Sequence, residues 1–97
     1  AEGLSVFRQA LAIDSTDARV WNNLGTAFLK QRQFVEAQHY LSGAVKRRPE
    51  DATLLLKLAD AHGGAGNLKQ ARRVLEQAQQ LAPDDPRVQK RLERLGR

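Results

Sequence analysis

The side chains that could carry out catalysis are few, and their spacing matches no catalytic motif. His39 and His62 lie in separate segments, and neither stands at motif spacing from a serine that it could activate. The run Gly63-Gly64-Ala65-Gly66 lacks the Lys and Ser/Thr that complete a phosphate-binding loop. The sequence contains no cysteine, which rules out disulfides and thiolate metal sites. It therefore predicts no enzyme, no cofactor and no metal site.

Basic and amide side chains are the groups that remain, and the chemistry open to them is binding. Sixteen Lys and Arg residues stand against 11 Asp and Glu, which gives a net charge of +5. Such a balance favours anionic partners, namely acidic peptides, nucleic acid or a membrane surface. Arginine outnumbers lysine, which suits bidentate contacts with carboxylates or phosphates. The alternative is a solvated surface whose charge is offset elsewhere in a longer protein.

The elements that position these groups are predicted from an alternation of large apolar and small residues at helical spacing. One predicted helix face carries Trp21, Leu24, Gly25 and Phe28, and the next carries Ala37, Leu41 and Ala44. Small residues let two helix axes approach to the short end of the usual range of about 8–10 Å. The stretch therefore predicts a helical hairpin in which the size of each side chain is specified.

This pattern recurs at an interval of 34 residues, which separates Asp17, Asp51 and Asp85. The series Trp-x2-Leu-Gly-x2-Phe, Ala-x3-Leu-x2-Ala and Pro between Trp21 and Pro49 resembles the tetratricopeptide repeat (TPR). The second copy is looser, because Leu55, Ala59 and His62 replace the tryptophan, the glycine and the aromatic residue.

The resemblance implies an all-α fold, a right-handed α-α superhelix of stacked antiparallel helix pairs with about six helices. Residues 1–97 are expected to form one domain, with residues 1–14 as the second helix of a truncated repeat, repeats at 18–51 and 52–85, and a capping helix at 86–97. Helices are predicted at 1–13, 18–31, 35–47, 52–61, 68–81 and from Pro86 onward. The turn at Gly63–Asn67 is predicted to be long, and the alternative is that its glycines give local flexibility or a close backbone approach to a ligand. Arg32 is predicted to occupy a slightly strained turn position, unless the turn itself differs. The chain lacks methionine and starts within a repeat, so a longer parent protein is expected.

In TPR arrays the first helices of successive repeats line a concave groove, and the resemblance implies the same here. The residues expected to face this groove are mostly basic or carry amides: Arg19, Asn22, Asn23, Thr26, Lys30, Thr53, Lys57, Asp60, Arg87, Lys90, Arg91 and Arg94. The expected function is a non-catalytic scaffold that binds an extended acidic peptide. Some TPR proteins hold a terminal carboxylate in a clamp. Asn23 resembles its middle asparagine, whereas Lys57 and Thr53 stand where arginine and lysine are usual.

Two alternatives stay open. Nucleic acid could bind the basic carboxyl-terminal helix, although the predicted surface has no aromatic residue for base stacking. The chain could instead form a homodimer through Leu4, Phe7 and Leu11, an apolar stripe on the first predicted helix. No apolar run reaches the roughly 18 residues of a membrane span, so a membrane partner is not expected. The lack of cysteine fits a reducing compartment, so the cytoplasm is expected over secretion, and the periplasm stays open.

Overall fold

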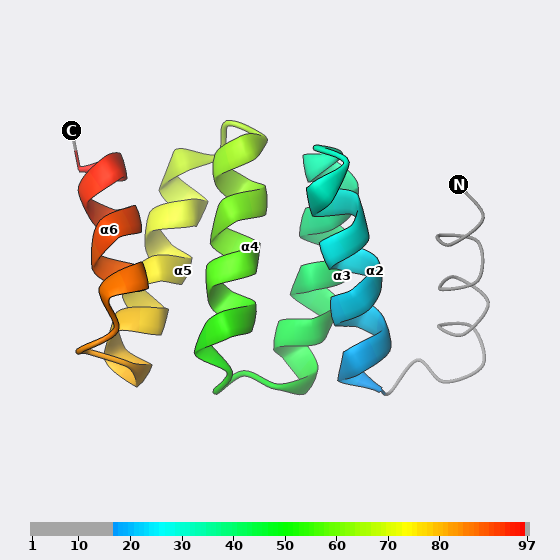
Figure 1. Cartoon of the computed structure of the whole chain (residues 1–97), viewed down its shortest axis with the longest axis horizontal. Coiled ribbons are helices and arrows are strands. Elements are labelled where there is room, and N and C mark those ends of the chain that lie inside the picture. The colour runs from blue at the N-terminus through cyan, green and yellow to red at the C-terminus, as the bar shows by residue number, and fades with distance from the viewer. Residues whose placement is uncertain (1–16, 97) are drawn as a thin grey trace.

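A computed structural model describes residues 17–96, which form five α-helices. They are α2 (Ala18–Lys30), α3 (Phe34–Arg47), α4 (Ala52–Gly64), α5 (Leu68–Leu81) and α6 (Pro86–Leu95). The helices follow one another in chain order along the long axis (Figure 1), and each packs on the next. The all-α prediction is thereby confirmed over these residues. The helix predicted at 1–13, with Leu4, Phe7 and Leu11, lies outside the described residues.

The helices α2, α4 and α6 begin with the same cap. The carboxylates of Asp17, Asp51 and Asp85 accept a backbone N–H of the first turn, at 2.9, 3.2 and 2.9 Å respectively. Such caps satisfy backbone donors that the helix leaves unpaired. In α6, Pro86 also occupies the first turn, where a missing N–H is tolerated. The repeated aspartates therefore fix where each of these helices starts.

Small residues hold α2 and α3 close together, as the alternation of sizes predicts. A Cβ added to Gly25 would lie 2.6 Å from Cγ of Leu41, so α3 occupies the space that a side chain would need. Ala37 and Ala44 are fully buried. Gly43, which the sequence did not single out, makes a similar notch, because its added Cβ would lie 2.2 Å from the ring of Trp21.

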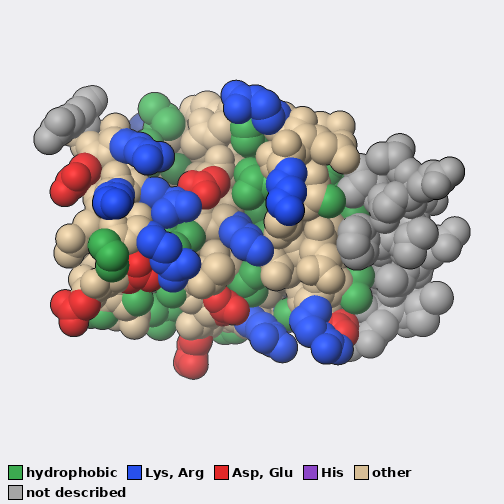
Figure 2. All heavy atoms as spheres, viewed as in Figure 1, with side chains coloured by type: hydrophobic (Ala, Val, Ile, Leu, Met, Phe, Trp, Pro, Cys, Tyr) green, Lys and Arg blue, Asp and Glu red, His purple; other side chains and the backbone are tan. Residues whose placement is uncertain are grey.

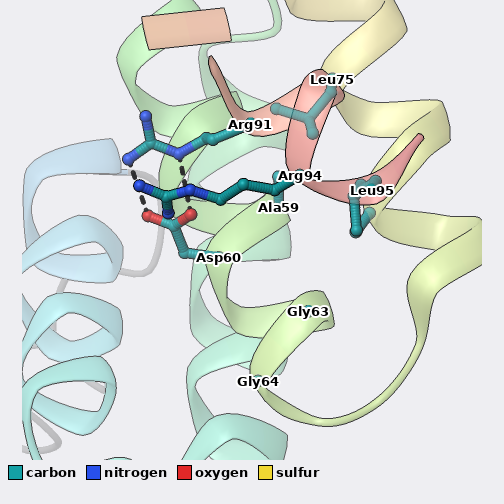
Figure 3. A pocket seen from close by; sticks show the side chains of 9 residues that line it. Ala59, Asp60, Gly63, Gly64, Leu75, Arg91, Arg94 and Leu95 are labelled. Atoms are coloured by element: carbon teal, nitrogen blue, oxygen red, sulfur yellow. Dashed lines mark hydrogen bonds and ion pairs between the residues drawn. The ribbon is translucent and has the colours of Figure 1, made fainter. Parts of the chain in front are cut away.

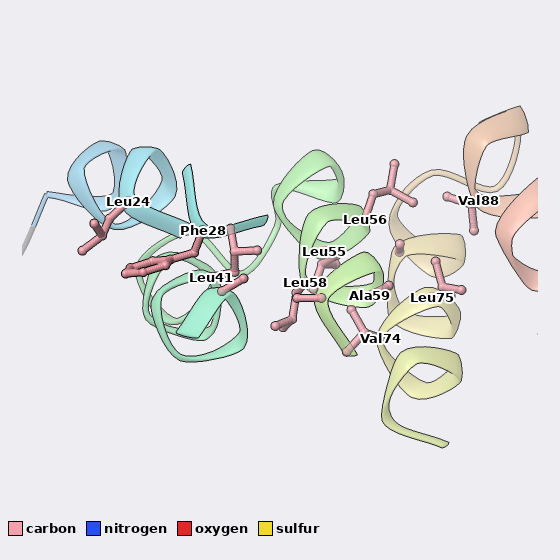
Figure 4. Packing of buried hydrophobic residues seen from close by; sticks show 13 residues of the cluster. Leu24, Phe28, Leu41, Leu55, Leu56, Leu58, Ala59, Val74, Leu75 and Val88 are labelled. Carbon is pink, nitrogen blue, oxygen red and sulfur yellow. The ribbon is translucent and has the colours of Figure 1, made fainter. Parts of the chain in front are cut away.

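One hydrophobic core runs through the array. Leu24, Phe28 and Leu41 join α2 to α3, and the core continues through Leu55 and Leu75 of α4 and α5 (Figure 4). It ends at α6, where Val88 is fully buried. Each hairpin therefore completes its core against the next, as expected of a stacked array.

The prediction of a long glycine turn after residue 61 is wrong. Helix α4 continues to Gly64, and the turn is closed by bonds from Ala65 N to Ala61 O and from Asn67 N to His62 O, at 3.0 and 2.8 Å. Glycine at 64 is explained by packing, since an added Cβ would lie 2.3 Å from the Phe34 ring. Of the described residues in this turn, only Gly66 needs a left-handed backbone, with φ of 86°.

The strained turn predicted at Arg32 is confirmed. Its φ of 60° is the one positive value at a non-glycine residue in the described part of the chain. Its guanidinium lies over the ring of Phe34, 5.5 Å from the centroid. Helix α2 ends at Lys30 and α3 begins at Phe34, each one residue before the predicted limit.

Candidate binding surface

All the residues predicted to face a groove lie on α2, α4 and α6. We call this the α2–α4–α6 surface. Figure 2 shows Lys and Arg side chains spread over this side of the molecule, with Asp and Glu among them. Side-chain interactions bring some of the predicted residues together in three groups and leave others separate.

The first group is centred on Lys57 of α4. Its ammonium donates to Oδ1 of Asn22 and to Oγ1 of Thr26, both at 3.1 Å, and so reaches back to α2. The Thr26 hydroxyl donates in turn to Asn22 Oδ1 at 3.2 Å. Lys57 is half-buried, and both of its acceptors are neutral. Because an ammonium has three N–H donors, one remains available to a ligand.

The second group is an ion pair between α4 and α6. Arg91 donates to both carboxylate oxygens of Asp60, from Nε at 2.8 Å and from Nη2 at 3.0 Å. The hydrogen bonds that Arg91 donates to this carboxylate raise the pKa of Arg91 above its ordinary value. The geometry is the bidentate one in which Arg binds carboxylates most strongly. Arg91 is therefore engaged within the chain, which the sequence prediction did not anticipate.

The third group lies where α4 and α6 begin. Arg87 pairs with its own cap residue, Asp85, at 2.7 Å and donates to Oγ1 of Thr53 at 3.5 Å. Arg19 pairs in the same way with Asp17 at 2.9 Å. Hydrogen bonds from these arginines hold the pKa of Asp17 and of Asp85 below its usual value.

The remaining predicted residues are separate from these groups. Asn23, Lys30, Lys90 and Arg94 are exposed, and the described part of the chain offers them no side-chain hydrogen bond or ion pair. The surface thus combines cations already matched by aspartates with cations that are not. Its net charge is smaller than the list of basic residues suggests.

Neither histidine belongs to this surface. His62 is half-buried and its Nδ1 lies 2.6 Å from Oε1 of Gln38, which also accepts from Asn67 at 3.0 Å. Burial lowers the pKa of His62. His39 is exposed, with its ring edge-on to Trp21. Within residues 17–96 no group of three or more His, Cys, Asp or Glu residues could hold a metal ion, and none of the helices there could cross a membrane.

Sequence reasoning missed a cavity next to the ion pair. It has a volume of about 160 Å³ and lies between α4, α5 and α6, with Leu75 and Leu95 among its lining residues (Figure 3). A signal for it was present in the repeat itself, because Gly63 stands where the preceding copy has Leu29.

The chain belongs to the tetratricopeptide repeat family. One family model, described as a tetratricopeptide repeat, matches residues 28–95, and a second with the same description matches residues 6–39. The fold and the 34-residue register described above agree with this assignment.

Two curated relatives are far longer than the matched region. The BBSome complex member BBS4 of Xenopus tropicalis is 33% identical over 85 residues, which cover 88% of the chain and 16% of that protein. Cellulose synthase operon protein C of Xanthomonas axonopodis pv. citri (strain 306) is 34% identical over 88 residues, which cover 82% of the chain and 6% of that protein. The chain thus spans a small part of the relatives that it matches.

Solved structures share the fold at low identity. The second TPR domain of human RPAP3, determined in complex with the HSP70 peptide SGPTIEEVD, has a TM-score of 0.90 at 19% identity and covers 97% of this chain and 78% of that one. The Yersinia enterocolitica type III secretion chaperone SycD, in complex with a peptide of the translocator YopD, has a TM-score of 0.87 at 24% identity. The match covers 98% of this chain and 78% of that one. These likenesses confirm the predicted superhelix of stacked helix pairs.

Proposed function

We propose that this chain is a non-catalytic protein-interaction scaffold that holds an extended acidic segment of a partner along the α2–α4–α6 surface. The observation that carries the proposal is Lys57. It is a half-buried cation in the middle helix of this surface, and within residues 17–96 its side-chain partners are the neutral oxygens of Asn22 and Thr26. A charge fixed in place without a counter-ion favours a ligand that supplies a carboxylate. The exposed amide of Asn23 can bind the backbone of the same ligand.

The relatives support this class of function. The RPAP3 domain and SycD were each determined with a bound peptide, and the HSP70 peptide SGPTIEEVD contains three acidic residues near its end. BBS4 is named as a member of a protein complex. These statements describe those proteins, and a peptide ligand for the present chain is our inference from them.

The same proposal divides the chain into repeats at 18–51 and 52–85, with α6 as a capping helix. In support, α6 exposes Gln89 and Glu93 at the positions where α4 buries Leu55 and Ala59. A helix that paired with α6 as α5 pairs with α4 would have to pack against Gln89 and Glu93. A polar outer face is typical of the helix that solvates one end of a repeat array.

Nucleic-acid binding through α6 is less well supported. Arg87 and Arg91 are already matched by Asp85 and Asp60, which reduces the positive field of this helix. Self-association through Leu4, Phe7 and Leu11 stays a prediction, since these residues lie outside the described range.

The test is the affinity of a fluorescein-labelled peptide of alternating Glu and Ser, measured by fluorescence anisotropy. Lys57→Glu should weaken binding by about tenfold or more, because a hydrogen-bonded charge contact becomes a repulsion. Lys69→Glu on α5 is the matched control, since it changes the net charge equally away from the α2–α4–α6 surface. Arg91 is left unchanged because it holds Asp60.

A second peptide, in which Gln replaces Glu, controls for the charge of the ligand. Lys57→Gln removes the charge without adding a carboxylate. It therefore tests whether the loss of binding in Lys57→Glu comes from disruption of the fold. Equal losses in Lys57→Glu and Lys69→Glu, or equal binding of the Glu and Gln peptides, would contradict the proposed site.

A further inference from the structure

The cavity between α4, α5 and α6 has the size of one apolar side chain. Its volume is about 160 Å³, and Ala59, Leu75 and Leu95 contribute apolar wall. An apolar cavity of about 150 Å³ in a protein accommodates a benzene molecule. Asp60, which is half-buried, and Arg94, which is exposed, also line this cavity and give it a polar edge (Figure 3).

Gly63 is the reason that this space is open. It belongs to α4 and lines the cavity, and an added Cβ would meet no atom within 4 Å among the described residues. Gly25, Gly43 and Gly64 differ from it, because at each of them a neighbouring side chain fills the space. Glycine within a helix is unfavourable relative to alanine. Packing does not require glycine at 63, so its effect is to leave room.

The preceding repeat shows what normally fills the equivalent position. Leu29 of α2 stands 34 residues before Gly63 and packs against the hydrophobic core. A leucine side chain thus completes the first hairpin at a place where the second hairpin has none. The second hairpin therefore offers an apolar site that a side chain from another molecule can enter.

The charges beside the cavity indicate what accompanies that side chain. Asp60 is matched by Arg91 through two hydrogen bonds. Arg94 adds a second cation, exposed and without an ion pair in residues 17–96. The edge thus carries one positive charge in excess.

We propose that this cavity receives an aliphatic or aromatic side chain of the bound segment, and that Arg94 pairs with a carboxylate beside that side chain. This inference rests on the proposed function and narrows its ligand from an acidic segment to one in which an apolar residue adjoins acidic ones. The apolar residue would be anchored at the α6 end of the α2–α4–α6 surface, next to the Asp60–Arg91 pair.

The test compares acetylated and amidated peptides SEELES and SEEAES, titrated into the whole chain and followed by amide chemical shifts. SEELES should bind about tenfold more tightly, since leucine buries three more carbon atoms than alanine. Gly63→Leu fills the cavity with the residue found at position 29 and should abolish this preference. Gly63→Ala is the matched control, because it also removes the helical glycine but keeps most of the cavity, and it should retain the preference.

Equal affinity of the two peptides for the wild type, or a preference that survives in Gly63→Leu, would overturn the inference. Arg94→Gln should weaken SEELES several-fold, and an unchanged affinity would overturn the pairing with Arg94. If neither peptide binds, the proposed function fails, and N-acetyl-leucine then tests the cavity alone. Shifts at Gly63, Leu75 and Leu95 that vanish in Gly63→Leu would support the pocket, and no shifts would refute it.

Discussion

Two glycines in helices give opposite predictions for the same substitution. Gly25 is buried in α2, and an added Cβ would lie 2.6 Å from Cγ and 3.1 Å from the backbone N of Leu41. Gly63 lies near the end of α4, where an added Cβ meets no atom of residues 17–96 within 4 Å. The change to alanine therefore isolates the effect of close helix packing from the effect of helix propensity.

The two contributions can be estimated separately. Replacing glycine by alanine within a helix stabilises it by about 0.5–1 kcal/mol. At Gly63 no packing cost opposes this stabilisation. Because the residue is close to the helix end, we expect the smaller value, a gain in unfolding free energy of about 0.5 kcal/mol. At Gly25 the new methyl group must displace Leu41, which is fully buried. Overpacking of this kind costs about 1–3 kcal/mol, which leaves a net loss of about 1 kcal/mol.

Thermal and urea unfolding, followed by circular dichroism, measure both variants. For a domain of this size, Gly25→Ala should lower Tm by roughly 4–8 °C and Gly63→Ala should raise it by roughly 2–4 °C. The dependence of unfolding free energy on urea should not change, because the surface exposed on unfolding is nearly the same. A Tm increase in Gly25→Ala equal to that in Gly63→Ala would refute the close approach of α2 and α3.

Three further predictions concern single residues. Ala44→Leu should destabilise the fold by about 1–3 kcal/mol, because the residue is fully buried, and an unchanged Tm would contradict this packing. Gly66→Ala should cost about 1–2 kcal/mol in urea unfolding, because φ is 86° there, and Arg32→Gly, at the equivalent turn with φ of 60°, should not destabilise. Burial lowers the pKa of His62 in the folded state, so the unfolded state takes up a proton first and stability should fall as pH drops below about 6.5. His62→Phe, which installs the residue found at Phe28, should show a smaller difference in Tm between pH 7.5 and 5.5, and an equal difference would exclude His62 as the cause.

The fold could be predicted because it depends on residue size and helix ends, which recur in the sequence. Asp17, Asp51 and Asp85 repeat at the same interval, and each caps a helix. The notch at Gly25 and the strained turn at Arg32 are visible because a repeat pattern shows what normally stands there. The caps and the turn depend on neighbouring residues, and the notch depends on a residue size that the repeat specifies.

The state of the basic side chains could not be predicted in the same way. The helical register predicts that Lys57 lies on α4 and that Arg91 and Arg94 lie on α6, but it does not determine which acceptor each side chain reaches. The long, flexible side chain of arginine can meet its own cap residue, as Arg87 does with Asp85, or a neighbouring helix, as Arg91 does with Asp60. The prediction of a long turn after residue 61 was wrong for a related reason. Three glycines in one short run serve three different purposes there, and composition alone does not separate them.

One contact between neighbouring repeats shows how the same backbone can give different binding chemistry. Lys57 reaches Thr26 and Arg91 reaches Asp60, and both contacts join residues 31 positions apart. The two contacts therefore join equivalent positions of the 34-residue repeat, and the donor and the acceptor both differ between them. With threonine as the acceptor the cation keeps its charge for a ligand, whereas with aspartate the charge is matched within the chain. The selectivity of such a surface thus depends on the residues that hold the cations as much as on the cations themselves. Counting basic residues along the sequence treats Arg91 and Lys57 alike, although Asp60 matches the charge of Arg91 and the described acceptors of Lys57 are neutral.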